Sequence, residues 1–108
     1  MPYAVLLTAG AERDLVAIHD HILDTDGASA ADRVLQRLLE VAERLAELPD
    51  RGRHPKELLA IGIHAYRQII MRPYRIIYRV VEEQVVIVLI ADSRRDMQTV
   101  LTRRLLGA

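Results

Sequence analysis

Five arginines in the second half of the chain are the side chains best suited to chemistry on an anion: Arg67, Arg75, Arg79, Arg94 and Arg95. Arginine stays protonated up to about pH 12, and its planar guanidinium can hold a phosphate or a carboxylate through two parallel hydrogen bonds. Such groups stabilise negative charge but are poor general bases. The pattern therefore predicts a surface that binds or stabilises an anion.

The first three of these arginines belong to residues 65–91, a segment that is predicted to form three strands joined by two tight turns. The middle strand, residues 74–80, alternates between two faces. Arg75 and Arg79 share one face, while apolar side chains take the other. We therefore expect a sheet with one apolar face and one basic face.

The turns and the last strand complete this predicted sheet. The first turn is expected at Arg72-Pro73, because proline cannot donate a hydrogen bond to a neighbouring strand, and the second at Glu82-Glu83. Residues 85–91 are apolar on both faces, which is typical of a central strand. The sequence predicts an antiparallel sheet with this strand inside. A loop then leads into a short C-terminal helix, one side of which carries Met97, Val100, Leu101 and Leu105.

The N-terminal half is predicted to be largely helical. Residues 3–8 alternate as a strand does, and Thr8 is suited to cap a helix that follows at once. Glu12 and Asp14 fall in the expected first turn, where the helix dipole favours negative charge. The fold class predicted is therefore α+β, with an N-terminal strand and helices packed on a small antiparallel sheet.

Two helices are expected to form a hairpin over residues 11–48. Asp26-Gly27 is predicted to end the first helix, and residues 29–32, Ser-Ala-Ala-Asp, resemble a capping box for the second. Apolar residues then recur at alternating spacings of four and three up to Leu48. These apolar seams are expected to pack on each other and on the sheet.

Composition limits the class of protein. The chain has 108 residues, which suits one domain, and no cysteine, which excludes disulfides and thiolate chemistry. His19 and His21 lie about 200° apart around a helix, so they cannot chelate one ion together. We expect no metal and no cofactor. Neither a signal peptide nor a membrane-spanning run is evident, so a cytoplasmic protein is expected.

The formal net charge of zero hides a division along the chain. Residues 1–60 hold seven basic and eleven acidic groups, a balance of −4, whereas residues 61–108 hold eight arginines and four acidic groups, a balance of +4. This asymmetry indicates an anionic partner for the C-terminal half, either phosphate or an acidic protein surface. Alternatively, Arg75 and Arg79 pair with acidic side chains of the helical hairpin and have a structural role.

The order and spacing of these elements resemble the RelE/ParE superfamily of bacterial toxins over nearly the whole chain, residues 1–108, as a single toxin domain. The resemblance is carried by the opening strand with Thr8, by residues 65–67 (Ala-Tyr-Arg), by residues 73–78 (Pro-Tyr-Arg-Ile-Ile-Tyr), and by residues 86–90 followed by Arg94-Arg95. It implies the toxin of a type II toxin–antitoxin system. The implied partner is a cognate antitoxin, whose disordered segment folds along the toxin surface in a hetero-oligomer.

RelE-like members of the superfamily cut messenger RNA on the ribosome, which needs cations around the phosphate and groups that move protons. The resemblance would assign Arg67, Arg75 and Arg95 as the cations and Glu57 as the base. Two further positions of the RelE pattern carry residues that cannot move protons, Ile69 and, near the position of a tyrosine, Leu101. This alternative would make the chain an endoribonuclease.

ParE-like members act on DNA gyrase, stabilise its broken-DNA state and cause growth arrest, and they are associated with plasmid stabilisation. This activity needs a binding surface and no proton transfer, so the ParE-like interpretation fits the sequence better. The expected contacts with target or antitoxin are the five arginines and, on the terminal helix, Met97, Leu101 and Leu105. A third alternative is a non-toxic member that only binds an antitoxin.

Overall fold

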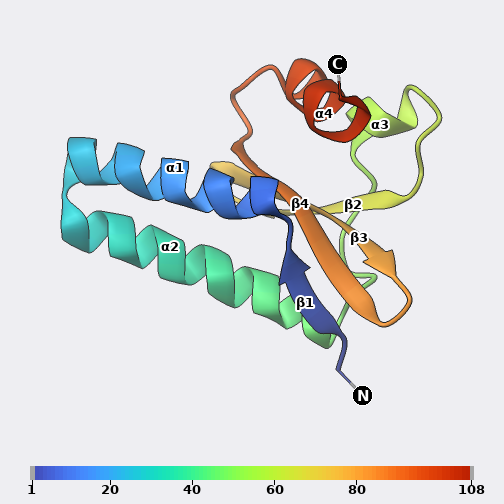
Figure 1. The fold of residues 1–108 in the computed structure, drawn as a ribbon, viewed down its shortest axis with the longest axis horizontal. Coiled ribbons are helices and arrows are strands. Elements are labelled where there is room, and N and C mark those ends of the chain that lie inside the picture. Colours follow the sequence, from blue (N-terminus) through green and yellow to red (C-terminus); the bar gives the residue numbers. More distant parts are fainter. Residues whose placement is uncertain (1, 108) are drawn as a thin grey trace.

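The computed structural model describes residues 2–107 and shows an α+β fold, as predicted (Figure 1). The elements in chain order are β1 (Ala4–Leu7), α1 (Ala9–Asp26), α2 (Ala28–Glu43), a 3₁₀ turn η1 (Arg44–Ala46), α3 (Lys56–Leu59), β2 (Tyr66–Met71), β3 (Tyr74–Val81), β4 (Gln84–Asp92) and α4 (Met97–Leu106). Within the described residues, none of the helices combines the length and the apolar character needed to cross a lipid bilayer.

The four strands form one sheet in the order β1-β4-β3-β2. Strands β2, β3 and β4 form the predicted antiparallel meander, and β4 lies inside the sheet as expected. The parallel pairing of β1 with β4, with Leu7 opposite Ile87, was not predicted, and it makes the four-stranded sheet mixed. A parallel neighbour needs a long crossover connection, and the helical hairpin supplies its first part.

Helices α1 and α2 form the predicted hairpin, which extends well beyond the sheet (Figure 1). The side chain of Thr8 caps α1 by accepting a hydrogen bond from the backbone N–H of Ala11 at 3.2 Å. Gly27 then ends α1 at a φ of 92°, a conformation that glycine adopts without steric strain. The predicted capping box was wrong, since α2 begins directly at Ala28 and Asp32 instead bonds to His19 Nε2 at 2.8 Å.

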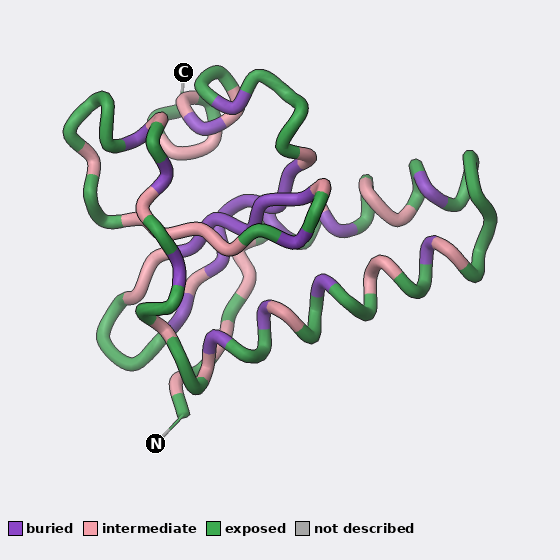
Figure 2. The backbone as a smooth tube through the Cα atoms, turned by 180° about the vertical axis from the view of Figure 1, so that it is seen from behind, coloured by how far each residue is buried: buried purple, intermediate pink, exposed green. Residues whose placement is uncertain are grey.

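Apolar side chains cover both faces of the sheet. The helical hairpin packs with Ile76 and Tyr78 of β3 in a first core, while α3 and α4 pack with Ile77 and Leu89 in a second core on the other face. Figure 2 shows the buried residues gathered along the strands. The predicted basic face is therefore not open, because α3 and α4 cover much of it and bury Arg75, which is 7 % exposed.

Candidate functional site

Arg75, the central arginine of the predicted surface, is held in a network of side chains rather than left free. Its Nη1 and Nη2 atoms each donate to one carboxylate oxygen of Glu57 at 2.9 Å, and its Nε donates to Gln68 Oε1 at 2.7 Å. Both members of the ion pair are largely buried, with 8 % and 13 % of the Arg75 and Glu57 side chains exposed. The pair fastens α3 to β3, so Arg75 does pair with an acid, but not with one from the helical hairpin.

Glu57, the residue expected to act as a base in an endoribonuclease, is therefore a constrained carboxylate. The hydrogen bonds from Arg75 lower its pKa below the usual value of 4.5, against the opposing effect of burial. Both of its oxygens already accept hydrogen bonds from Arg75. A carboxylate that is stabilised in this way is poorly suited to taking up a proton.

Arg67 and Arg79 lie near the other end of the strands. Arg67 donates to the backbone carbonyl of Gly52 at 2.8 Å and holds the loop before α3. The guanidinium of Arg79 lies over the ring of Tyr66, 5.6 Å from its centroid, an arrangement that gives a cation–π contact. The Nε atom of Arg79 is buried without a hydrogen-bond partner among residues 2–107. Arg79 thus remains a cation without an acidic partner in the described part of the chain.

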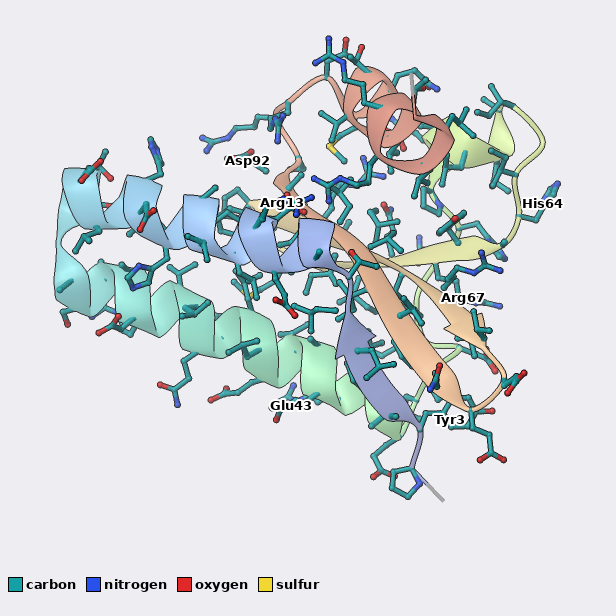
Figure 3. The ribbon with its side chains drawn as sticks, in the orientation of Figure 1. Tyr3, Arg13, Glu43, His64, Arg67 and Asp92 are labelled. Atoms are coloured by element: carbon teal, nitrogen blue, oxygen red, sulfur yellow. The ribbon has the colours of Figure 1, made fainter. Side chains whose placement is uncertain are left out.

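Arg94 and Arg95 follow β4 and behave differently. The Arg94 side chain and backbone both donate to Asp92 Oδ1 at 2.9 Å, and these bonds lower the pKa of Asp92 to about 2. The side chain of Arg95 makes no ion pair within residues 2–107 and borders two hollows, of about 280 and 260 Å³. Figure 3 places Arg67 and Asp92 toward opposite ends of the sheet. The predicted arginines are therefore spread over several places.

The apolar residues expected on the terminal helix are mostly inside the protein. Met97 is 5 % exposed and Leu101 is fully buried, and both pack in the second core. Leu105 is half-buried against the same core. These side chains hold α4 on the sheet, and the large apolar residue that α4 exposes is Leu106, at 56 %.

One ion pair that sequence reasoning missed joins α1, β4 and α4. Arg104 donates through Nη1 and Nη2 to the two oxygens of Asp14, each at 2.8 Å, and its Nη1 also donates to the carbonyl of Val88 at 2.8 Å. Asp14 Oδ2 also accepts the backbone N–H of Ile90 at 2.9 Å. We call Asp14 and Arg104 the α4 clamp. The two residues are 90 positions apart, and Asp14 was interpreted only as a partner of the helix dipole.

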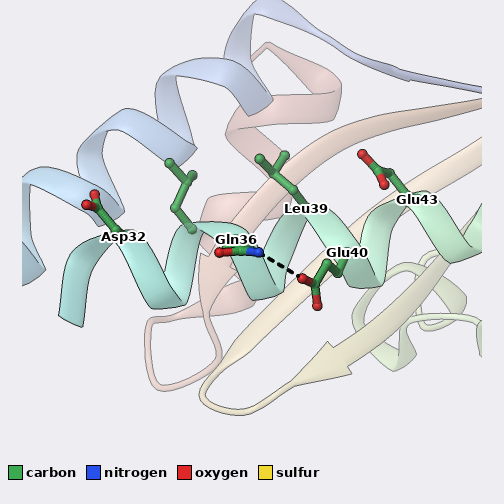
Figure 4. A pocket seen from close by; sticks show the side chains of 6 residues that line it. Asp32, Gln36, Leu39, Glu40 and Glu43 are labelled. Carbon is green, nitrogen blue, oxygen red and sulfur yellow. Dashed lines mark hydrogen bonds between the residues drawn. The ribbon is translucent and has the colours of Figure 1, made fainter. Parts of the chain in front are cut away.

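A second feature without a sequence signal is a groove on the outer face of α2. It has a volume of about 500 Å³ and is lined by Asp32, Leu35, Gln36, Leu39, Glu40 and Glu43 (Figure 4). We call it the α2 groove. Gln36 donates to Glu40 Oε1 at 3.3 Å, and Leu39 remains 37 % exposed. The groove combines a short apolar floor with three carboxylates.

Solved structures from two bacterial toxin–antitoxin systems and of one bacterial toxin share this fold. The chain superimposes on a chain of the chromosomal ParDE system of P. aeruginosa with a TM-score of 0.71 and 22 % identity, covering 83 % of this chain and 95 % of that one. A chain of the RelBE2 toxin–antitoxin complex of Mycobacterium tuberculosis gives a TM-score of 0.64 and 24 % identity, covering 85 % and 99 %. A mutant of the E. coli toxin RelE in the free state gives 0.56 and 15 %, covering 93 % of each chain. The chain therefore shares its fold with these solved structures.

Sequence comparison identifies the family of the chain. The model of the family described as the ParE toxin of the type II toxin–antitoxin system parDE matches residues 5–97. The chain belongs to this family. It is 27 % identical to Toxin ParE3 of Caulobacter vibrioides over 100 residues, which cover 93 % of this chain and 96 % of that protein. The resemblance inferred from the sequence is confirmed.

Proposed function

We propose that this toxin acts by binding DNA gyrase and stabilising its broken-DNA state, and that a cognate antitoxin neutralises it. The observation that carries the proposal is that Arg75 donates hydrogen bonds to both carboxylate oxygens of Glu57. With both carboxylate oxygens accepting hydrogen bonds and a lowered pKa, Glu57 is a weak proton acceptor. A toxin that works by binding needs no such acceptor, and gyrase and its DNA place this action in the cytoplasm.

The residues around the arginines support the same proposal. Cleavage of messenger RNA requires an acid as well as a base, whereas arginine remains protonated and cannot exchange protons near neutral pH. The chain has Ile69 and Leu101 at two positions of the RelE pattern, and Leu101 is fully buried in the second core. The arginines are therefore better suited to contacting an anionic partner than to catalysing proton transfer.

Gyrase supercoiling tests the proposed target. Relaxed plasmid and gyrase are titrated with the purified, antitoxin-free chain, and both supercoiling and cleaved DNA are followed. We expect supercoiling to fall while protein-linked breaks accumulate. Absence of both effects from folded protein that arrests growth on induction would contradict the proposal. In that case, messenger RNA cleavage in a translation extract, compared between wild type and Glu57→Gln, would test the RelE-like alternative.

The α2 groove supports a site for the antitoxin. Leu35 and Leu39 offer an apolar floor, and carboxylates flank it. An amphipathic segment with basic residues beside its apolar face would match both features. The structural neighbours from P. aeruginosa and M. tuberculosis are described as a ParDE system and a RelBE2 complex, which fits a toxin with a protein partner.

Substitution in the groove tests this contact. Leu39→Glu should weaken binding to the antitoxin encoded by the adjacent reading frame by at least about tenfold, because it places a charge on the apolar floor. Val16→Glu is a matched control, since Val16 is 61 % exposed on α1 and does not line the groove. Equal affinities of the two variants and the wild type would remove the α2 groove from the antitoxin interface.

A further inference from the structure

A hollow beside α4 is lined almost entirely by arginine. It has a volume of about 260 Å³ and is formed by Arg95, Val100, Arg103 and Arg104. Arg95 comes just before α4, and the other three residues follow at helical spacings of three and four, so they share one side of the helix. We call this hollow the α4 groove.

The positive charge of the α4 groove is only partly compensated. Arg104 is neutralised by Asp14, whereas Arg95 and Arg103 have no carboxylate within 4.0 Å in the part of the chain that the structure describes. Three arginines against one carboxylate leave two positive charges facing solvent. The groove therefore attracts an anion from solution.

The α4 clamp also fixes the position of Arg104, which forms one wall of the α4 groove, before any ligand binds. Arg104 is fixed by Asp14 and by the carbonyl of Val88, and these bonds leave its Nε–H and one Nη2–H without a partner in the described residues. Gly10 makes room for this arginine, because a Cβ atom at residue 10 would lie 3.0 Å from Arg104 Nη1. A held guanidinium with free donors loses little conformational freedom when it binds a ligand.

We propose that the α4 groove binds phosphates of the DNA backbone. Guanidinium groups bind phosphate oxygens through paired hydrogen bonds. Contacts of this kind with the DNA backbone require charge rather than apolar surface. Among residues 2–107, Val100 is the only apolar residue of the lining, so this part of the groove lacks the apolar centre typical of a protein–protein contact. The inference rests on the proposed function, in which gyrase presents its bound DNA to the toxin.

DNA binding can be measured without gyrase, which separates the two proposals. Fluorescence anisotropy of a labelled duplex of roughly 20 base pairs, long enough for several phosphate contacts, is recorded over a range of salt concentrations for wild type and for Arg95→Gln/Arg103→Gln. We expect the double variant to bind more weakly and its slope of log K against log salt to be smaller in magnitude by about 2, one for each phosphate contact. Arg33→Gln/Arg37→Gln, on the exposed face of α2, has the same net charge and should keep the wild-type slope.

Two outcomes would overturn the inference: equal slopes for the α4-groove variant and the α2 control, or loss of binding to single-stranded RNA while duplex DNA binding is unchanged. Thermal unfolding of each variant checks that the fold is intact. We expect an intact fold because the substituted side chains are exposed. Gyrase supercoiling is then measured with the same proteins. Duplex binding that depends on the groove, without any effect on gyrase, would remove the proposed target and leave the phosphate site standing.

Discussion

Tyr78 shows how one side chain connects a strand to a distant loop. It is fully buried in the first core, and its hydroxyl donates to the carbonyl of Pro49 at 2.8 Å while accepting from the backbone N–H of Gly52 at 2.9 Å. A Cβ atom at residue 52 would lie 2.6 Å from that hydroxyl, so only glycine fits. The Tyr78 hydroxyl thus acts together with Arg67 to hold the loop before α3 in place.

Removing this hydroxyl should be costly. Tyr78→Phe leaves the buried Gly52 N–H and the partly buried Pro49 carbonyl without their partner, so we expect a loss of about 1–3 kcal/mol in the free energy of unfolding. Urea denaturation followed by circular dichroism measures it. Tyr66→Phe is the control, because it keeps the ring beneath Arg79 and should change stability by less than about 0.5 kcal/mol. Equal losses in the two variants would contradict this role of the Tyr78 hydroxyl.

The Arg75–Glu57 pair predicts a pH dependence of stability. Because the pKa of Glu57 is lowered on folding, its contribution to stability is present above about pH 4.5 and is lost as the pH falls through the folded-state pKa. Glu57→Gln removes this titration, so stability should fall less steeply below pH 4.5 than in the wild type. Urea unfolding at several pH values tests this. Glu47→Gln, at an exposed position, should keep the wild-type slope.

At the scale of the elements, the α4 clamp explains why α4 stays on the sheet. Strand β1 ends at Leu7, opposite Ile87, so the next residues of β4 lack a neighbouring strand on that side. In this region Asp14 accepts a hydrogen bond from the Ile90 N–H, and Arg104 donates one to the Val88 carbonyl. Side chains thus replace the missing strand and hold the helix at the same time.

Breaking the clamp should loosen α4. Asp14→Asn removes the charge that Arg104 faces, and we expect a loss of about 2 kcal/mol, less than for a fully buried pair because 30 % of the Arg104 side chain is exposed. Hydrogen exchange of the α4 amides should become faster than in the wild type. Asp24→Asn, at an exposed position of the same helix, should leave α4 protection unchanged, and an identical exchange pattern in Asp14→Asn would disprove the clamp.

Local patterns predicted most of the elements, because they depend on neighbouring residues. Alternation and turn residues were enough for the antiparallel meander, and the spacing of apolar residues was enough for the hairpin. The parallel placement of β1 depends on a partner strand that begins at Gln84, far away in the sequence. Helix α3 is only four residues long, which is too short to show a helical spacing of apolar residues. The covering of the predicted basic face therefore had no local signal.

The same limit applied to the candidate site. Arg75 and Glu57 were both selected from the sequence, but the bonds between them were not foreseen, because α3 had not been predicted. The pairing of Asp14 with Arg104 depends on contacts between the two ends of the chain. Met97 and Leu101 were correctly placed on one side of the terminal helix, yet that side faces the second core. The spacing of apolar residues identifies the apolar face of a helix, but not the part of the protein against which that face packs.

At the scale of the whole molecule, both cores depend on β4. This strand lies between β1 and β3 and supplies side chains to the first core, such as Ile87, and to the second, such as Leu89. A chain that ends at Val81 should therefore remain unfolded, with little dispersion in its amide NMR spectrum. A chain that ends at Asp96 keeps β4 and loses only α4, so it should retain the first core. Native-like dispersion in the shorter chain would contradict this account.

The order of the strands also bears on how the toxin is made. The sheet cannot form until β4 reaches its place between β1 and β3, and the helical hairpin, α3, β2 and β3 all precede β4 in the chain. Pairing of strands that lie so far apart in the sequence slows folding. A growing polypeptide that has not yet reached β4 therefore lacks the strand on which both cores depend. Until then the apolar side chains of β1 and the helical hairpin remain exposed and prone to aggregation.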